Sequence, residues 1–176
     1  MTHFNFILFC FVFFLLTSCS DEPVRNQPSA KELKEKLIEH NQKKVRTEED
    51  IIDSYVDKNY PKAQKTETGL RYVIFPAENR SDLVPGKAQK VTIDYDIELL
   101  NGNVIYSTKK EGLPEKFRIE HEDAPAGLHE GIQLMHLGDS AVFILPSFLG
   151  YGFTGDQYTI GKNAILVYKV VLIEIE

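Results

Sequence analysis

The sequence predicts an α+β fold, with an antiparallel sheet of about five strands wrapped over one short helix and preceded by short N-terminal helices. Two patterns predict it. Between residues 29 and 60 the apolar residues recur at helical spacing, whereas from Thr68 onward they alternate with polar residues, as in half-buried strands. The 176 residues suit one ordinary domain with an extension. The 11 Phe and 8 Tyr supply apolar surface for a core.

Residues 1–18 are predicted to be a lipoprotein signal peptide. The apolar run from Phe4 to Leu16 is shorter than the roughly 20 residues that cross a bilayer as a helix, and its position is typical of a signal-peptide core. Residues 16–19, Leu-Thr-Ser-Cys, resemble the lipobox of bacterial lipoproteins. We therefore expect Cys19 to carry the lipid anchor. The chain would then be held on a membrane of the cell envelope, at its periplasmic face or at the cell surface, with residues 19–28 as a polar tether.

Residues 29–60 are predicted to form a helical extension. Ser29 and Glu32 have the form of a capping box, and an apolar face at helical spacing follows them. Residues 47–50 repeat the start signal, which predicts a second short helix that ends before Pro61. The alternatives that remain open are an arm through which the chain forms a homodimer or docks, and either a helix pair folded back on its own domain or a solvated spacer.

Residues 68–176 are predicted to form the domain itself. Alternating residues from Val91 to Leu99 indicate one long strand, and Asn101-Gly102-Asn103 is a hairpin signal that returns the chain through residues 104–106. The remaining expected elements are a short strand around 117–119, a short helix over 127–135, and strands over 141–145 and 164–175.

Charge and composition exclude several kinds of site. The formal net charge of -6 argues against a protein that tracks nucleic-acid phosphates. The five His and two Cys show no metal-ligand spacing, so we expect no metal and no cofactor. His129 and His136 are expected to face solvent.

Four segments in order resemble one known family. They are residues 68–72 (Thr-Gly-Leu-Arg-Tyr), 131–138 (Gly-Ile-Gln-Leu-Met-His-Leu-Gly), 146–152 (Pro-Ser-Phe-Leu-Gly-Tyr-Gly) and 160–168 (Ile-Gly-Lys-Asn-Ala-Ile-Leu-Val-Tyr). Together they are similar to the FK506-binding-type (FKBP) family of peptidyl-prolyl cis-trans isomerases. Within it, the chain looks closest to lipoprotein isomerases associated with bacterial gliding motility.

The resemblance implies an enzyme that acts on X-Pro bonds of protein substrates. The catalytic positions that it implies are Tyr95, Phe117, Tyr151, Ile160 and Tyr168, and the substrate-binding positions are Ile105, Tyr106 and Leu128. Leu128 would form the floor of the pocket, and Tyr151 would donate its hydroxyl hydrogen to a substrate carbonyl. Tyr95 and Tyr168, taken alone, also fit a purely structural core, because aromatic residues on alternating strand positions are ordinarily buried.

Four positions depart from the family's pattern. Leu128 stands where Trp is usual, Tyr106 where Asp is usual, and Glu115 where Phe is frequent. Pro125 falls where a backbone N–H usually anchors ligands, and proline has none. These changes argue against binding of FK506. They leave two functions open: an isomerase for exported or envelope proteins, and a peptide-binding chaperone that has lost turnover.

Overall fold

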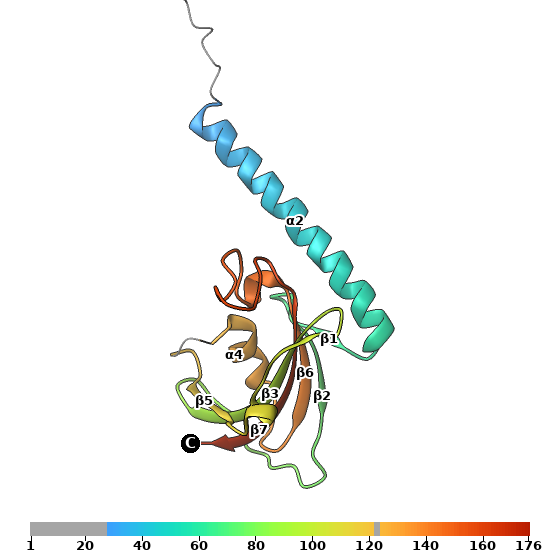
Figure 1. Ribbon diagram of the computed structural model, residues 1–176, viewed down its shortest axis with the longest axis vertical. Coiled ribbons are helices and arrows are strands. Elements are labelled where there is room, and N and C mark those ends of the chain that lie inside the picture. The colour runs from blue at the N-terminus through green and yellow to red at the C-terminus, as the bar shows by residue number, and fades with distance from the viewer. Residues whose placement is uncertain (1–27, 122–123) are drawn as a thin grey trace, which may run out of the picture. The chain divides into compact units, whose positions relative to one another are not determined.

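The computed structural model describes residues 28–121 and 124–176 (Figure 1). The predicted signal peptide, Cys19 and all but the last residue of the tether lie outside the described residues. The chain divides into two compact units, Met1–Glu39 and His40–Glu176. Everything that forms the candidate site belongs to the second unit.

Helix α2 (Ala30–Asn59) is one continuous helix, so the expectation of two short helices was wrong. The predicted capping box forms, because the Ser29 N–H donates to Glu32 Oε2 (2.8 Å) and the Glu32 N–H donates to Ser29 Oγ (3.2 Å). The second start signal lies inside the helix, where the Thr47 hydroxyl donates to the Lys43 carbonyl (3.0 Å). No Gly or Pro stands between residues 30 and 59 to end the helix earlier.

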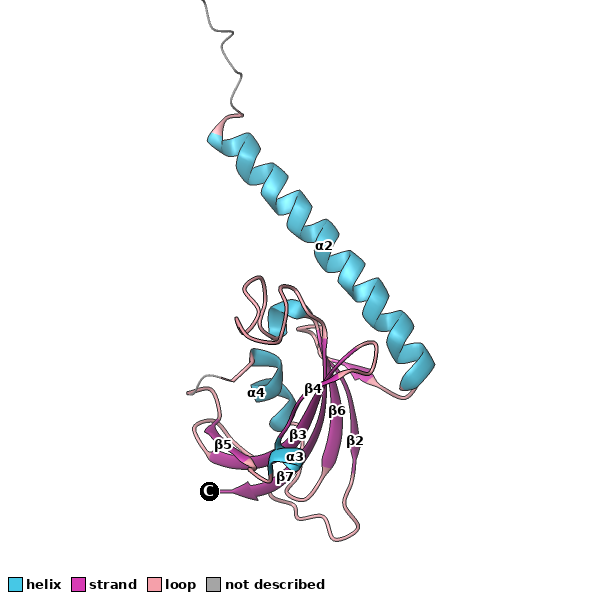
Figure 2. Ribbon diagram, in the orientation of Figure 1, coloured by secondary structure: helices cyan, strands magenta, loops and turns pink. Residues whose placement is uncertain are grey.

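The α+β prediction is confirmed. The described residues form a seven-stranded antiparallel sheet in the order β1-β2-β6-β7-β3-β4, with β5 also paired to β3 (Figure 2). The strands are β1 (Gln64–Lys65), β2 (Arg71–Phe75), β3 (Lys90–Leu99), β4 (Val104–Ser107), β5 (Glu115–Arg118), β6 (Ser140–Leu145) and β7 (Leu166–Ile175). The sequence pattern gave no signal for the two-residue β1, nor for the short helix α3 (Thr108–Glu111).

The predicted short helix is α4 (Ala126–Ile132), and it covers the inner face of the sheet. Its Leu128 and Ile132 join one buried cluster with Phe143 of β6. Two glycines let the helix approach this closely: a Cβ added to Gly131 would lie 2.7 Å from the Phe143 ring, and one added to Gly127 would lie 2.7 Å from Leu145. Figure 1 shows α4 against this face of the curved sheet.

The outer face of the sheet is covered by the later turns of α2. Ile52 and Val56 pack with Val142 and Ile144 of β6 and with Val167 of β7 in a second buried cluster. Strand β6 is therefore buried on both faces, which explains why every residue from Ala141 to Leu145 is apolar.

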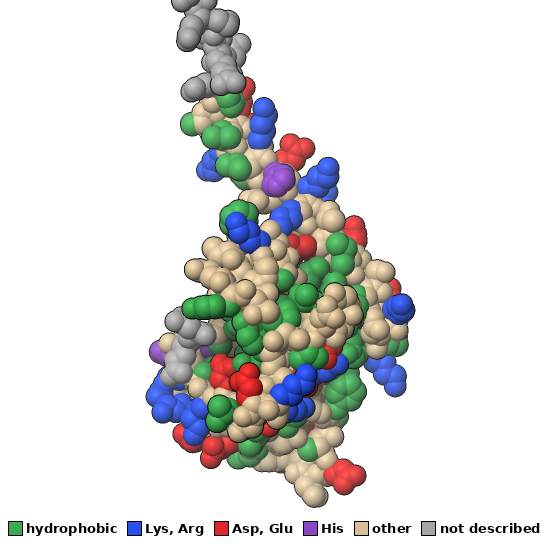
Figure 3. All heavy atoms as spheres, viewed as in Figure 1, with side chains coloured by type: hydrophobic (Ala, Val, Ile, Leu, Met, Phe, Trp, Pro, Cys, Tyr) green, Lys and Arg blue, Asp and Glu red, His purple; other side chains and the backbone are tan. Residues whose placement is uncertain are grey.

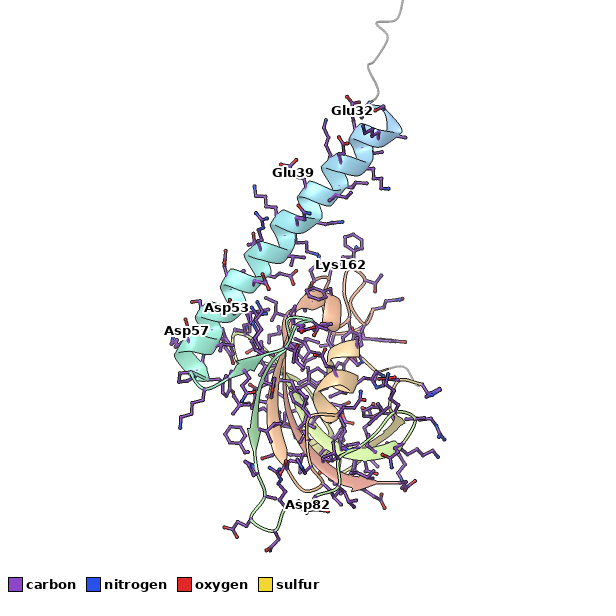
Figure 4. All side chains as sticks on the ribbon, turned by 180° about the vertical axis from the view of Figure 1, so that it is seen from behind. Glu32, Glu39, Asp53, Asp57, Asp82 and Lys162 are labelled. Carbon is purple, nitrogen blue, oxygen red and sulfur yellow. The ribbon has the colours of Figure 1, made fainter. Side chains whose placement is uncertain are left out.

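An ion pair between the buried Arg71 and the exposed Asp53 accompanies this contact. Arg71, which is 2% exposed, donates from Nη2 to Asp53 Oδ1 (2.6 Å) and from Nη1 to the Gly69 carbonyl (2.6 Å). Asp53 is labelled in Figure 4. From His40 onward, α2 therefore packs on its own domain, while the interpretation as a dimerisation arm stays a prediction for the earlier turns.

Candidate active site

The eight predicted site residues all belong to the main hydrophobic cluster of the domain, which also contains most of its core. Their side chains come from β3, β4, β5, α4, β7 and the loop between β6 and β7. The buried members are Phe117, Leu128, Ile160 and Tyr168, and the half-buried members packed against them are Tyr95, Ile105, Tyr106 and Tyr151. The four buried residues lie in the core, and the four half-buried ones remain partly open to solvent.

Tyr95, Tyr151, Tyr168 and Glu115 make up one polar part of this cluster. The rings of Tyr95 and Tyr168 lie 5.7 Å apart between centroids at an angle of 56°. The Tyr95 hydroxyl donates to Glu115 Oε2 at 2.5 Å, and Tyr151 lies close enough to Tyr168 to help raise the pKa of Tyr168. Glu115, which replaces the frequent Phe, therefore orients a wall of the site.

All three phenols hold their protons more firmly than a free tyrosine. Burial, followed by the hydrogen bond to Glu115, raises the pKa of Tyr95. Burial also raises the pKa of Tyr151 and, to a larger extent, that of Tyr168. Each hydroxyl consequently stays un-ionised and able to donate across the physiological pH range.

Asp156 is a site residue that sequence reasoning missed. Its Oδ2 accepts from the Tyr106 hydroxyl (2.5 Å), and its Oδ1 accepts from the backbone N–H groups of Tyr158 (2.9 Å) and Ile160 (2.8 Å). Burial opposes ionisation, yet these hydrogen bonds, with that from Tyr106 the strongest, hold the pKa of Asp156 below its usual value. The rim therefore has a carboxylate beside Tyr106, although the family's usual Asp is missing at that position.

A tight turn at Gly155 brings the side chain of Asp156 to the backbone N–H of Ile160. Gly155 has φ +67°, and a Cβ there would lie 2.2 Å from the Ile160 carbonyl oxygen. Only glycine fits this backbone. A Gly-Asp pair inside a loop is typical of such turns, because an Asp side chain bonds backbone N–H groups a few residues on. That was the one sequence signal that could have indicated Asp156.

His129 supports the base of the site, so the expectation that it faces solvent was wrong. It is 9% exposed, and its ring stands edge-on to Phe117, with centroids 5.3 Å apart. Its Nδ1 accepts from the Glu120 N–H (3.2 Å). Pro125 begins the same helix, and its carbonyl accepts from the N–H groups of Leu128 (2.9 Å) and His129 (3.1 Å). Pro125, which has no N–H to donate to a ligand, thus starts the helix that carries Leu128, the predicted floor residue.

Exposed apolar side chains occur on the loops that border the cluster. Phe153 and Tyr158 are 71% and 92% exposed and belong to the loop that carries Tyr151 and Ile160. Lys162, labelled in Figure 4, places its Nζ 5.3 Å from the centre of the Phe153 ring. In Figure 3 hydrophobic side chains are visible across the middle of the domain, with charged groups around them.

Other kinds of site find no support in residues 28–121 and 124–176. No group of three or more His, Cys, Asp and Glu there could hold a metal ion. None of the helices in this part of the chain has the length and apolar character needed to span a membrane.

A family model for FKBP-type peptidyl-prolyl cis-trans isomerases matches residues 82–173, slightly more than half of the chain. The chain belongs to this family. Strands β3 to β6, helix α4 and most of β7, and with them all eight predicted site residues, lie inside the matched FKBP-type segment. Helix α2 and strands β1 and β2 lie before it.

Similar proteins include bacterial members of the FKBP family. The chain is 31% identical over 142 residues to the probable FKBP-type isomerase FkpA of Neisseria meningitidis, covering 80% of this chain and 51% of that protein. It is 34% identical over 109 residues to the outer membrane protein MIP of Legionella longbeachae, covering 62% of this chain and 45% of that one. The chain therefore spans about half the length of these curated relatives.

The same fold occurs in a solved structure. The crystal structure of FkpA from Escherichia coli superimposes with a TM-score of 0.65 at 22% identity, covering 85% of this chain and 74% of that one. At this identity the likeness concerns the fold alone.

Proposed function

We propose that the chain is a peptidyl-prolyl cis-trans isomerase that accelerates X-Pro isomerisation in exported or envelope proteins. The observation that carries the proposal is the convergence of the eight predicted residues, from six parts of the fold, into one apolar cluster edged by un-ionised phenols. Membership of the FKBP-type family supports the same reaction.

The chemistry requires no nucleophile. Rotation about an X-Pro bond crosses a barrier of about 18 to 20 kcal/mol, because resonance stiffens the amide. A site lowers this barrier by binding the twisted amide better than either planar form. In the proposed mechanism the proline ring packs on Leu128 and Phe117, whose buried side chains exclude water. The Tyr151 hydroxyl donates to a carbonyl of the substrate.

A peptide-binding chaperone without turnover is the second candidate. It is favoured by Pro125, which offers no backbone donor to a bound peptide, and by the exposed aromatic rings of Phe153 and Tyr158. Leu128 also gives a smaller floor than the usual Trp. The isomerase would interconvert the cis and trans forms of the bound peptide, whereas the chaperone would only bind it.

The proposed location is the cell envelope. Cys19 in its lipobox would anchor the chain to a membrane, at the periplasmic face or at the cell surface. The lipobox and the gliding-motility relationship rest on sequence resemblance. Labelling cells with a radioactive fatty acid tests the anchor: the parent should incorporate label, and Cys19→Ala should incorporate none.

The first test of function follows cis-to-trans conversion of an X-Pro reporter peptide with residues 20–176, which retain every residue that the structure describes. We expect acceleration by the parent, a reduction of kcat/KM of roughly tenfold in Tyr151→Phe, and a larger loss in Phe117→Ala. Peptide binding without acceleration by a folded parent would replace the isomerase with the chaperone.

A further inference from the structure

The loop between β6 and β7, residues 146–165, carries two of the proposed catalytic residues. Tyr151 follows the short 3-10 helix η1 (Ser147–Leu149), and Ile160 lies near the other end of the loop. A loop of this length with four glycines has many accessible conformations, so holding it in one conformation costs entropy. Contacts from elsewhere must therefore fix the first part of the loop, residues 146–152, and its last part, residues 160–165, which we call its first and second legs.

The first leg is fixed by Glu48 of α2. Glu48 is only 8% exposed, although it is an acidic residue on a largely solvated helix. Its Oε2 accepts from the Ser147 N–H (3.0 Å), and its Oε1 accepts from the Ser147 hydroxyl (2.8 Å). The residue before η1 is Pro146, whose side chain makes no capping hydrogen bond. Glu48 thus supplies from another element the acceptor that a helix usually takes from its own N-cap.

The second leg is fixed by Lys44, one turn earlier on the same face of α2. Its Nζ donates to the side-chain oxygen of Asn163 and lies 3.8 Å from Glu48 Oε1. Figure 4 labels Lys162, the neighbour of Asn163, on the part of the loop beside α2. Lys44 and Glu48 together therefore form one charged pair that contacts both legs.

Backbone bonds join the two legs to each other. The Asn163 N–H donates to the Gly152 carbonyl (2.8 Å), and the Gly152 N–H donates to the Ser147 carbonyl (2.8 Å). Tyr151 lies inside this chain of bonds, between Ser147 and Gly152. A displacement of Ser147 or Asn163 would consequently move Tyr151.

We propose that Glu48 and Lys44 are positioning residues of the active site, which hold the loop so that Tyr151 and Ile160 face the cluster. The proposal rests on the proposed isomerase function. It places part of the working enzyme on α2, before the segment that matches the family model. The helix is then a component of the site rather than a spacer.

The test uses residues 20–176 with Glu48→Ala, Glu48→Gln and a matched control, Asp53→Asn. Asp53 lies on the same helix and also bonds a buried group, Arg71, but it does not reach the loop. We expect Glu48→Ala to lower kcat/KM on the reporter peptide by roughly 5- to 20-fold, mainly through kcat, because a misplaced catalytic group costs rate. Glu48→Gln should stay within about twofold of the parent, since its amide oxygen can still accept from Ser147.

A second readout does not depend on turnover. In Glu48→Ala the Ser147 amide hydrogen should exchange faster with solvent, and the NMR signals of the Ile160 methyl groups and the Tyr151 ring should shift. In Asp53→Asn and Glu48→Gln these signals should stay near those of the parent. If the parent has no turnover, the proposed function fails, and this readout alone decides the positioning role.

Two results would overturn the proposal. One is an Asp53→Asn variant that loses as much kcat as Glu48→Ala at equal stability, which would make the effect general to the docking of α2. The other is unchanged Tyr151 and Ile160 signals in Glu48→Ala. If Glu48→Ala does not fold, Ser147→Ala replaces it, because it removes one of the two bonds and should give the same signal shifts at about half the size or less.

Discussion

Different interactions stabilise the packing on the two faces of the central sheet. On the inner face, α4 and the site residues form a large apolar cluster in which the hydroxyls of Tyr95 and Tyr106 point to carboxylates at the edge. On the outer face, a small apolar contact around Ile52 lies beside polar links made by Arg71 and Glu48. Apolar packing has no preferred direction, whereas hydrogen-bonded links fix one geometry. The links on the outer face therefore set the orientation of α2 on its own unit, and the inner face holds the proposed active site.

Ile52→Ala should have the largest effect on stability. Ile52 is fully buried between α2 and the sheet, so we expect a loss of about 2 to 5 kcal/mol in the free energy of unfolding. Urea denaturation of residues 20–176 measures it. Leu33→Ala is the matched control, because Leu33 is 50% exposed and should change stability by less than about 0.5 kcal/mol. Equal losses in both variants would mean that the outer contact contributes little.

Gly131→Ala is the corresponding change on the inner face. In an exposed helix this substitution stabilises by about 1 kcal/mol. Here the added Cβ would meet the Phe143 ring at 2.7 Å, so we expect a net loss of about 1 to 3 kcal/mol and a displaced Leu128. Thermal unfolding and kcat/KM on the reporter peptide check both effects. A stabilised, fully active variant would show that α4 can move away from the sheet without cost.

Tyr95→Phe tests the polar edge of the inner face and its pH dependence. Loss of the bond to Glu115 should cost about 1 kcal/mol at pH 7. The folded pKa of Tyr95 is raised, so its stabilisation is complete below the ordinary tyrosine pKa of about 10. As the pH rises further the unfolded chain loses its proton first, and stability falls by at most about 1.4 kcal/mol per pH unit for this group.

The measurement for Tyr95 is urea denaturation between pH 8 and pH 11. The parent should lose stability with rising pH more steeply than Tyr95→Phe, although other tyrosines contribute to both curves. Parallel curves would mean that the Tyr95 hydroxyl ionises as readily in the folded chain as in the unfolded one. Because Tyr95 remains partly open to water, the difference in slope should be below the single-group maximum.

Asp156→Asn should have the smallest effect. Its side chain is half-buried, and an asparagine oxygen can still accept from the N–H groups of Tyr158 and Ile160. We expect a change in stability below about 0.5 kcal/mol and a change in kcat/KM of about twofold. Asp156→Ala removes both backbone bonds and should lower kcat/KM further. Equal activity in the two variants would contradict the role of Asp156 in holding Ile160.

Local sequence patterns predicted the sheet well, because they are set by residues near each other in the chain. Alternation marked β3 within one residue at its start, and Asn101-Gly102-Asn103 gave the turn, in which Gly102 has φ +85°. The start signal at Thr47 gave a wrong prediction of a second helix, because such a signal is also local. Nothing at residue 47 reveals that the helix has already begun.

Long-range polar contacts could not be predicted in this way. The sequence places Glu48 on a helix with many other acidic residues, but its partner Ser147 stands 99 residues away. Tyr106 and Asp156 are 50 residues apart, and each looks like an ordinary surface residue alone. The eight site residues were found because they occupy positions of a known family pattern. Their roles stay predictions until the variants are measured.

The position of β7 has a consequence for how the chain folds. In the sheet β7 lies between β6 and β3, although it follows every other described strand in the sequence. Strands β3 and β6 therefore lack their principal partner until residues 166–175 have emerged from the ribosome. Pairing over such separations is slow, on the order of milliseconds to seconds. Until then, β3 and β6 each expose an edge of unpaired backbone N–H and C=O groups that other chains can bind.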